Sequence, residues 1–228
     1  MTELFEAFHV AREMVRGFRT LHFVGPCVTV FGSARFAEGH PYYELARRVG
    51  SELARVGFTV MTGGGPGVME AANRGAREAG GHSVGCNIRL PHEQSANPYL
   101  DRVVTFDRFF VRKYMLRKYS YAFVVLPGGF GTMDEAFETI TLVQTGKIHQ
   151  FPVVLMGREY WQPMLGFLDR MVAATTISPD DPARFHLTDD PAEAAGLVRH
   201  EGLARFGLTY GPRVKPRWWM FERGLNGR

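Results

Sequence analysis

The chain of 228 residues contains only two cysteines and four lysines, and it lacks any long apolar run. No segment approaches the roughly 20 apolar residues that a membrane-spanning helix needs, and the first residues lack the basic and apolar regions of a signal peptide. Cys27 and Cys86 both fall in predicted strands, which indicates buried reduced thiols, and neither has His or Cys neighbours at the spacing of a metal site. We therefore expect a cytoplasmic protein without a membrane segment and without a bound metal.

Several common signatures of α/β enzymes are also missing. There is no G-x-x-x-x-G-K-[ST], which excludes a P-loop NTPase, and no G-x-G-x-x-G follows the first predicted strand, which excludes the dinucleotide fingerprint. There is no G-x-S-x-G, which excludes the usual α/β-hydrolase elbow. Schiff-base chemistry needs a placed lysine. Only Lys113 is predicted to lie near the glycine-rich turns described below, and its neighbour Arg112 indicates anion binding instead.

What the chain does contain is typical of a globular α/β protein, with 45% apolar and 22% charged residues. Apolar runs alternate with segments of helical periodicity, which predicts a parallel sheet with helices on both faces. The fold class we expect is a single α/β domain with a Rossmann-like, doubly wound parallel sheet. The predicted strands are 27–32, 58–62, 83–88, 102–106, 121–126, 152–156 and 185–187; the predicted helices are 3–20, 41–56, 67–79, 108–119, 131–145, 160–173 and one that begins at Pro191.

The segment LPGGFGTMDE, from Leu126 to Glu135, is the most informative in the chain. A buried strand ends in Pro-Gly-Gly, and the residues after Thr132 have helical apolar spacing. Such a turn leaves backbone N–H groups unpaired at a helix N-terminus, where the helix dipole favours an anion such as a phosphate. Thr132 and Glu135 also fit a capping box, in which Glu135 would accept a bond from the Thr132 N–H. The three glycines, which a cap does not need, favour the phosphate site.

Two further glycine-bearing turns follow predicted strands. The strand 58–62 leads into TGGGPG, and the first predicted strand leads into Gly32-Ser33. In an open parallel sheet, ligands bind outside the carboxyl ends of the strands. We therefore expect all three turns to form one crevice, in which Gly128 to Thr132 hold a phosphate with help from Ser33 or from Gly64 and its neighbours.

A basic helix precedes the strand that ends in the Pro-Gly-Gly turn. Arg112 and Lys113 lie in its N-terminal part, which we expect near the crevice. The fork of an arginine can hold a phosphate in two places, while a lysine adds a point charge. Arg117 and Lys118 lie five positions further on, so the two pairs point in different directions and at most one pair faces the crevice.

Arg112-Lys113, residues 120–123 and PGGFGTMDE together closely resemble the Lonely Guy (LOG) family, the cytokinin riboside 5'-monophosphate phosphoribohydrolases once labelled lysine decarboxylases. The resemblance runs from about Val28 to Phe167, and the stretch TGGGPGVMEAAN is similar to that of the longer bacterial members. It implies catalytic roles for Arg112 and Glu135. Together with the crevice argument, which contributes Ser33, Gly64 and Gly128, it implies substrate binding by Ser33, Gly64, Glu93, Lys113, Gly128, Gly129, Phe130, Gly131, Thr132, Met133, Asp134 and Thr141.

The expected parts of the chain are a leading helix (1–24), a nucleotide-binding α/β domain (25–200) and a basic, Trp-containing tail (201–228). Residues 199–228 hold seven of the 27 basic and two of the 23 acidic residues, so the rest of the chain has 20 basic and 21 acidic residues. Basic and aromatic residues together occur in some nucleic-acid binders. Because the domain itself is not basic, we favour packing of the tail on the domain or on a neighbouring subunit, and nucleic acid is not an expected partner.

The resemblance implies hydrolysis of the N-glycosidic bond of a purine nucleoside 5'-monophosphate to free base and ribose 5-phosphate. It implies no cofactor, and it implies a homo-oligomer, either a dimer or a larger assembly of dimers. The family often has Met-His where this chain has Phe109-Phe110, and Asp where Tyr121 stands. An alternative function is a carrier that binds a nucleotide or a nucleotide-like cofactor without cleaving it. A cytokinin nucleotide, AMP and other monophosphates all stay open as the substrate.

Overall fold

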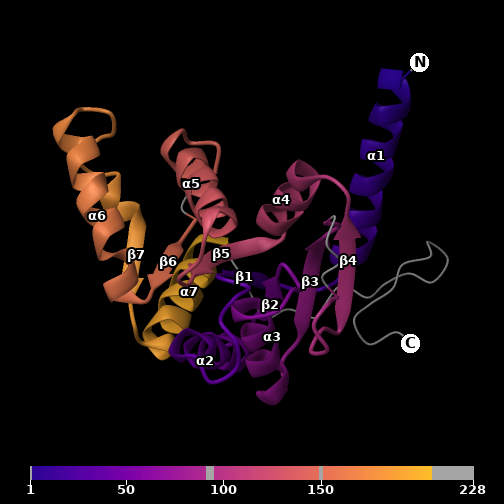
Figure 1. Ribbon diagram of the computed structural model, residues 1–228, viewed down its shortest axis with the longest axis horizontal. Coiled ribbons are helices and arrows are strands. Elements are labelled where there is room, and N and C mark those ends of the chain that lie inside the picture. Colours follow the sequence, from indigo (N-terminus) through magenta and orange to yellow (C-terminus); the bar gives the residue numbers. More distant parts are fainter. Residues whose placement is uncertain (1, 91–94, 149–150, 207–228) are drawn as a thin grey trace.

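The computed structural model describes residues 2–90, 95–148 and 151–206, and within these residues the chain forms one sheet of seven strands (Figure 1). All neighbouring strands pair in parallel, in the order β4-β3-β2-β1-β5-β6-β7. The predicted parallel sheet is therefore confirmed. The strands are β1 (Cys27–Phe31), β2 (Thr59–Thr62), β3 (Ser83–Ile88), β4 (Arg102–Phe106), β5 (Ser120–Val125), β6 (Val153–Met156) and β7 (Phe185–Thr188).

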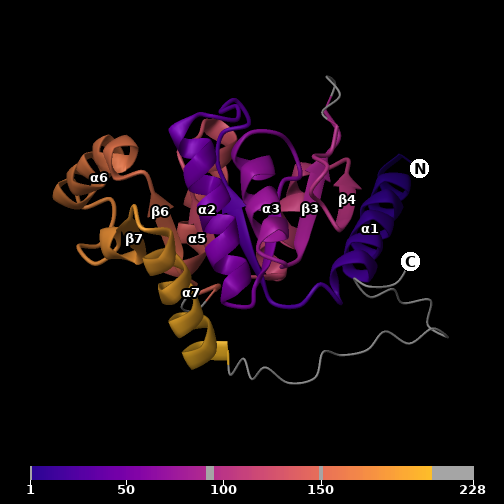
Figure 2. The same cartoon turned by 90° about the horizontal axis from the view of Figure 1, so that it is seen from below.

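Helices cover both faces of this sheet, as Figures 1 and 2 show from two directions. One buried apolar cluster contains residues of α1, α4, α5 and α6, and a second contains residues of α2, α3 and α7. The doubly wound α/β fold expected from the sequence is thus confirmed. The helices are α1 (Thr2–Leu21), α2 (Pro41–Arg55), α3 (Val68–Glu78), α4 (Phe109–Lys118), α5 (Phe130–Gln144), α6 (Arg158–Ala173) and α7 (Pro191–Phe206), with a short 3-10 helix, η1 (Pro182–Arg184), before β7.

The central strand β1 shows how the sequence produces two apolar cores. Cys27 and Phe31 belong to the first cluster, whereas Val28 and Val30 belong to the second. Side chains alternate across a strand, so a strand covered by helices on both sides is apolar at nearly every position. The continuous apolar runs of this chain are the consequence.

The strand order reverses between β1 and β5. The chain moves outward from β1 to β2, β3 and β4, and then returns past β1 to continue through β5, β6 and β7. Because crossovers between parallel strands are right-handed, this reversal moves the connecting helices to the other face of the sheet. Ligands bind at such a switch point, outside the carboxyl ends of the two strands. Gly32-Ser33 follows β1 there, and the Pro-Gly-Gly turn follows β5.

The leading helix α1 packs on α4 and β4 at one end of the sheet. Gly17 of α1 closely approaches Met115 of α4. The buried carboxylate of Glu13 accepts hydrogen bonds from the backbone N–H groups of Asp107 and Arg108, the latter at 3.2 Å. Arg108 is the N-cap residue of α4 and its side chain makes no capping bond, so Glu13 fixes the backbone just before the helix begins.

The boundaries expected after residue 24, between the leading helix and the domain, and after residue 200, between the domain and the tail, stay predictions. Helix α7 continues past residue 200 to Phe206, and most of the basic tail, residues 207–228, lies outside the described residues. Cys27 and Cys86 are buried free thiols, as expected. None of the helices in the described ranges is both long and apolar enough to cross a bilayer.

Candidate active site

The turn between β5 and α5 presents free backbone N–H groups. Gly129 is the N-cap of α5, and its carbonyl accepts bonds from the N–H groups of Thr132 and Met133, both at 3.0 Å. The N–H groups of Phe130 and Gly131 therefore precede the first intrahelical hydrogen bond. They lie at the positive end of the helix dipole, which is a favourable place for an anion.

The capping-box alternative for Glu135 is wrong. Helix α5 begins at Phe130, so Thr132 lies inside the first turn and is not the N-cap, and α5 has no capping bond from a side chain. The carboxylate of Glu135 instead lies 3.8 Å from the guanidinium of Arg112, and only 7% of its side chain is exposed. The acid is thus part of the crevice.

The three glycine-bearing turns meet at Ser33, as the sequence predicts. The Ser33 N–H donates to the Pro127 carbonyl (2.9 Å), and the Ser33 carbonyl accepts from the Val68 N–H (3.0 Å). Gly128 lies so close to the same point that a Cβ on it would collide with Thr132 Oγ1 and reach Ser33 N. Only a glycine lets the turn after β5 approach the turn after β1 in this way.

A pocket of about 550 Å³ opens at this junction, within the size range of small-molecule sites. Its wall is formed by the loop after β1, the start of α5 and single residues from α3, α4 and α6. The lining residues are Phe31, Gly32, Ser33, Ala34, Arg35, Phe36, Met69, Arg112, Gly128, Gly129, Phe130, Gly131, Thr132, Glu135 and Tyr160.

Arg112 reaches the pocket from α4 across the end of β3. Its Nε donates to the Cys86 carbonyl (2.9 Å), while Nη1 faces Glu135 Oε1 at 3.8 Å. The guanidinium passes over Gly63, where a Cβ would lie 2.6 Å from Nη2. The hydrogen bond to Cys86 fixes the fork, so the position of the positive charge beside Glu135 is set by the backbone of β3.

Burial changes the acid strength of Glu135. Removal from water raises the pKa of its carboxyl to about 7, and this effect outweighs the opposing charges of Arg112 and Lys113. Both the protonated and the ionised forms are consequently populated near neutral pH. A group with this property can act as a general acid or a general base.

The structure brings together eight of the residues that the sequence predicts for the site. Their catalytic and binding roles stay predictions, but their placement around one pocket fits those roles. They are Ser33, Arg112, Gly128, Gly129, Phe130, Gly131, Thr132 and Glu135.

Lys113 and Asp134 do not line this pocket. Lys113 Nζ donates to Asp134 Oδ1 (2.9 Å) and also pairs with Glu138, so it links α4 to α5. Lys113 and Glu138 line a separate groove between α1, α4 and α5. A substrate contact by Lys113 or Asp134 stays a prediction.

Three other predicted residues also lie elsewhere. Gly64 donates its N–H to Thr62 Oγ1 (2.9 Å) and accepts at its carbonyl from the Asn97 N–H (2.9 Å), so both backbone groups are used inside the protein. Met133 packs on the apolar core, and Thr141 donates from its hydroxyl to the Phe137 carbonyl further along α5. Glu93 lies outside the described residues.

Sequence reasoning missed Arg35, Phe36, Met69 and Tyr160. The first two follow Ser33 in the loop at the switch point, and Met69 follows the TGGGPG turn, so proximity to these turns was a usable signal. Tyr160 comes from α6, and no local pattern connects it to the site. Its hydroxyl donates to the Gly128 carbonyl (2.7 Å), which holds the peptide group just before Gly129.

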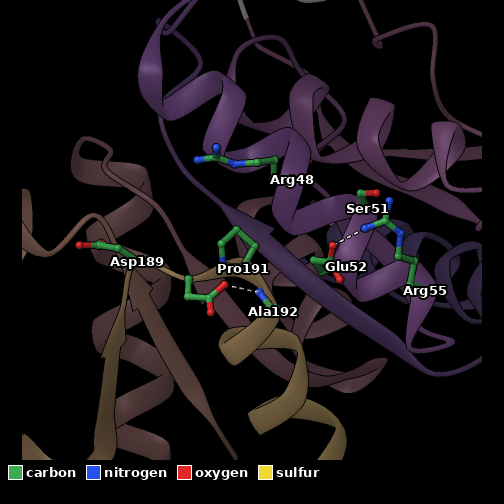
Figure 3. A pocket seen from close by; sticks show the side chains of 8 residues that line it. Arg48, Ser51, Glu52, Arg55, Asp189, Pro191 and Ala192 are labelled. Carbon is green, nitrogen blue, oxygen red and sulfur yellow. Dashed lines mark hydrogen bonds and ion pairs between the residues drawn. The ribbon is translucent and has the colours of Figure 1, made fainter.

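A second hollow, between α2 and the start of α7, does not offer comparable chemistry (Figure 3). Asp190 accepts from the Ala192 N–H (2.9 Å) and so caps α7. Arg55 pairs with Glu52 of the same helix. Within the described residues, no three His, Cys, Asp or Glu side chains gather as a metal site would require.

Comparison with known proteins identifies the family. A family model described as "possible lysine decarboxylase" matches residues 69–198, more than half of the chain. A cytokinin riboside 5'-monophosphate phosphoribohydrolase of Arabidopsis thaliana is 32% identical, over 87% of this chain and 92% of the relative. A probable enzyme of the same name from Oryza sativa is 35% identical over 76% and 71% of the two chains. One from Mycobacterium tuberculosis is 32% identical over 66% and 82%.

Two solved structures have a similar fold. The Moco carrier protein of Chlamydomonas reinhardtii has a TM-score of 0.57 and 26% identity, with 79% of this chain and 98% of that one covered. The structural genomics target TM1055 has a TM-score of 0.57 and 28% identity, over 77% and 99% of the two chains. On the matched family model and on relatives that share more than 30% identity over most of their length, this chain belongs to the Lonely Guy (LOG) family.

Proposed function

We propose that this protein hydrolyses the N-glycosidic bond of purine nucleoside 5'-monophosphates, releasing the free base and ribose 5-phosphate. The observation that carries the proposal is the buried Arg112–Glu135 pair, which faces the N-terminus of α5 across one pocket. The names of the relatives from Arabidopsis thaliana and Mycobacterium tuberculosis support the same reaction.

The start of α5 holds the phosphate in this proposal. The N–H groups of Phe130 and Gly131 are free of intrahelical bonds, and the helix dipole adds partial positive charge there. Thr132 and Glu135 follow within the next turn. A phosphate bound at the helix end therefore places the attached ribose beside the carboxylate of Glu135.

Cleavage of an N-glycosidic bond develops positive charge on the sugar, as in glycosidase transition states. The ionised form of Glu135 stabilises this charge and accepts a proton from the attacking water. The water oxygen bonds to C1' of the ribose, and the bond from C1' to the base nitrogen breaks with its electrons moving to the base. The base takes up one proton from solvent, and Glu135 later returns to solvent the proton that it accepted. A guanidinium stays protonated in proteins, so Arg112 orients Glu135 and the substrate and is not the acid.

The test is the release of base by the wild type and by Glu135→Gln, with AMP and isopentenyladenosine monophosphate as substrates. The glutamine keeps the size of the side chain and removes the charge, and we expect turnover to fall by roughly 10² to 10⁴. The relative rates on the two nucleotides identify the preferred base. Turnover of Glu135→Gln near that of the wild type would refute the role of this residue.

A second candidate function is a carrier that binds a nucleotide-like cofactor without cleaving it. The resemblance in fold to the Moco carrier protein of Chlamydomonas reinhardtii favours it. The buried Arg112–Glu135 pair favours hydrolysis. A carrier would bind nucleotide stoichiometrically, with no free base after prolonged incubation.

Assembly into a homo-oligomer, either a dimer or a larger assembly of dimers, is also part of the proposal. Several large apolar side chains are exposed on neighbouring helices, which is unusual for a surface facing water. Sedimentation of the wild type as a monomer would contradict this part. The exposed side chains are Leu4, Phe5 and Phe8 on α1, Phe109 and Phe110 on α4, and Phe130 on α5.

The proposed location is the cytoplasm. The two buried free thiols, Cys27 and Cys86, support it, because reduced cysteines are typical of that compartment. Detection of the protein in a fractionated cell tests this placement.

A further inference from the structure

Arg35 stands in the wall of the pocket, although it is far in sequence from the other charged residues there. It lies in the loop between β1 and α2 and shares the pocket with Gly129 and Gly131. Its backbone is fixed, because the Arg35 N–H donates to Ser33 Oγ (3.1 Å) and Ser33 is bonded to the turns on both sides. The side chain itself is exposed to solvent.

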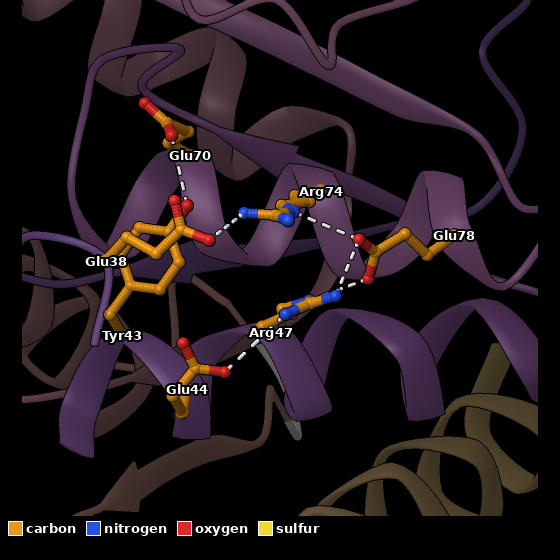
Figure 4. A network of polar contacts seen from close by, with 7 residues as sticks. All are labelled: Glu38, Tyr43, Glu44, Arg47, Glu70, Arg74 and Glu78. Atoms are coloured by element: carbon orange, nitrogen blue, oxygen red, sulfur yellow. Dashed lines mark hydrogen bonds and ion pairs between the residues drawn. The ribbon is translucent and has the colours of Figure 1, made fainter. Parts of the chain in front are cut away.

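The far end of the same loop is also held in place. Glu38 pairs with Arg74 of α3 at 2.6 Å, and Arg74 is in turn bonded to Glu78 at 3.0 Å (Figure 4). Glu78 also pairs with Arg47 of α2 at 2.7 Å. This network joins the loop to α2 and α3, two of the helices on that face of the sheet. The loop that carries Arg35 is thus anchored at Ser33 and at Glu38.

The charges around the pocket do not balance. Among the lining residues that the structure describes, Arg35 and Arg112 carry positive charges, and Glu135 is the carboxylate. Arg112 faces Glu135 and is also bonded to the Cys86 carbonyl. In the described part of the chain, no carboxylate lies within ion-pair distance of Arg35. The pocket therefore carries about one uncompensated positive charge, to which the start of α5 adds its partial charge.

We propose that Arg35 binds the phosphate of the ligand and makes the pocket selective for phosphorylated compounds over the corresponding nucleosides. The guanidinium fork binds two phosphate oxygens, and the N–H groups at the start of α5 bind from the other side. The inference rests on the proposed function for the nucleoside part of the ligand. The phosphate contact itself does not depend on cleavage.

The test compares Arg35→Ala and Arg35→Lys with Arg170→Ala as a matched control. Arg170 is exposed on α6 and does not line the pocket, so its loss removes the same charge from the surface alone. Binding of ribose 5-phosphate is measured by calorimetry, and base release is measured with AMP and with adenosine. We expect Arg35→Ala to raise the Kd of ribose 5-phosphate and the KM of AMP by roughly 10- to 100-fold, because a charge-assisted bond is lost.

Further readouts separate a phosphate contact from a structural effect. Arg35→Lys is expected to be intermediate, since it keeps the charge and loses the fork. Turnover of adenosine and the kcat for AMP are expected to match those of Arg170→Ala. Equal ribose 5-phosphate affinity in Arg35→Ala and Arg170→Ala overturns the inference, and so does an equal loss of activity on adenosine and AMP.

Failure of the proposed function would look different. If the wild type binds ribose 5-phosphate but releases no base, hydrolysis is refuted, and the calorimetric comparison still decides the role of Arg35. If the wild type binds neither ribose 5-phosphate nor AMP, both proposals are overturned. Thermal unfolding of Arg35→Ala is expected to match the wild type, because the side chain is exposed.

Discussion

Replacing Arg112 by Gln should move the acid limb of the pH–rate profile to higher pH. Burial raises the pKa of Glu135 to about 7, while the positive charge of Arg112 opposes that increase. Catalysis in our account needs the ionised form, so kcat/KM of the wild type should fall as the pH drops below about 7. Loss of the guanidinium removes a favourable partner of the carboxylate, and the pKa of Glu135 should rise further.

The geometry sets the size of this effect. Two unit charges 3.8 Å apart interact by on the order of 4 kcal/mol at an effective dielectric constant of about 20, equivalent to about three pKa units. The charge of Arg112 is spread over a planar group that also holds the Cys86 carbonyl. We therefore expect a shift of about one to two pH units, to an acid limb near pH 8 to 9.

The assay is base release from AMP between pH 5 and 10, with kcat/KM fitted for each variant. Lys113→Gln is the control, because Lys113 also lowers the pKa of Glu135 but is itself neutralised by Asp134 and Glu138. Its acid limb should move by less than about half a unit. An acid limb of Arg112→Gln that coincides with the wild type, or a wild-type limb near pH 4.5, would refute the electrostatic reasoning.

Three further predictions concern stability and positioning. The folded-state pKa of Glu135 is raised, so its contribution to the free energy of unfolding is most favourable below pH 4.5 and is lost as the pH rises through about 7. In denaturant unfolding, Glu135→Gln should therefore be more stable than the wild type at pH 8 by up to about 3 kcal/mol, and the two proteins should be equally stable near pH 4.5. Tyr160→Phe removes the hydrogen bond to the Gly128 carbonyl, so steady-state kinetics should show a KM for AMP raised about three- to tenfold, with a kcat within about twofold of the wild-type value. An unchanged KM would contradict the positioning role of Tyr160. Glu13→Ala removes the acceptor for the Arg108 N–H at the start of α4, so thermal and chemical unfolding should show a loss of stability of about 1 to 2 kcal/mol, and kcat/KM should fall. Glu13→Gln should recover most of both, and an unchanged kcat/KM in Glu13→Ala would show that α1 does not influence the site.

The local features of this fold could be predicted from the sequence because they are encoded by neighbouring residues. The apolar run before Pro127 and the glycines after it specify a strand, a turn and a helix start without reference to the rest of the chain. The convergence of the turns at Ser33 and Gly128 followed from the rule that parallel strands end on the same edge of a sheet. The order of the strands was not needed for that inference.

Contacts between distant elements could not be predicted in this way. Arg112 and Glu135 were paired through resemblance to a family, since spacing alone also allowed a helix cap for Glu135. Tyr160 reaches Gly128 from α6, and its position depends on how that helix packs. The positive charge of Lys113 suits an anion, but three-dimensional packing places this residue beside Asp134 and Glu138.

The measurement that tests the central claim most directly is the release of free base from AMP by the wild type and by Glu135→Gln, followed by chromatography, with nucleotide binding measured on both. The account predicts adenine and ribose 5-phosphate in equal amounts from the wild type, a rate at least about 100-fold lower for Glu135→Gln, and nucleotide binding by both proteins. Tight binding of nucleotide by the wild type with no base released would contradict the account and would favour a carrier.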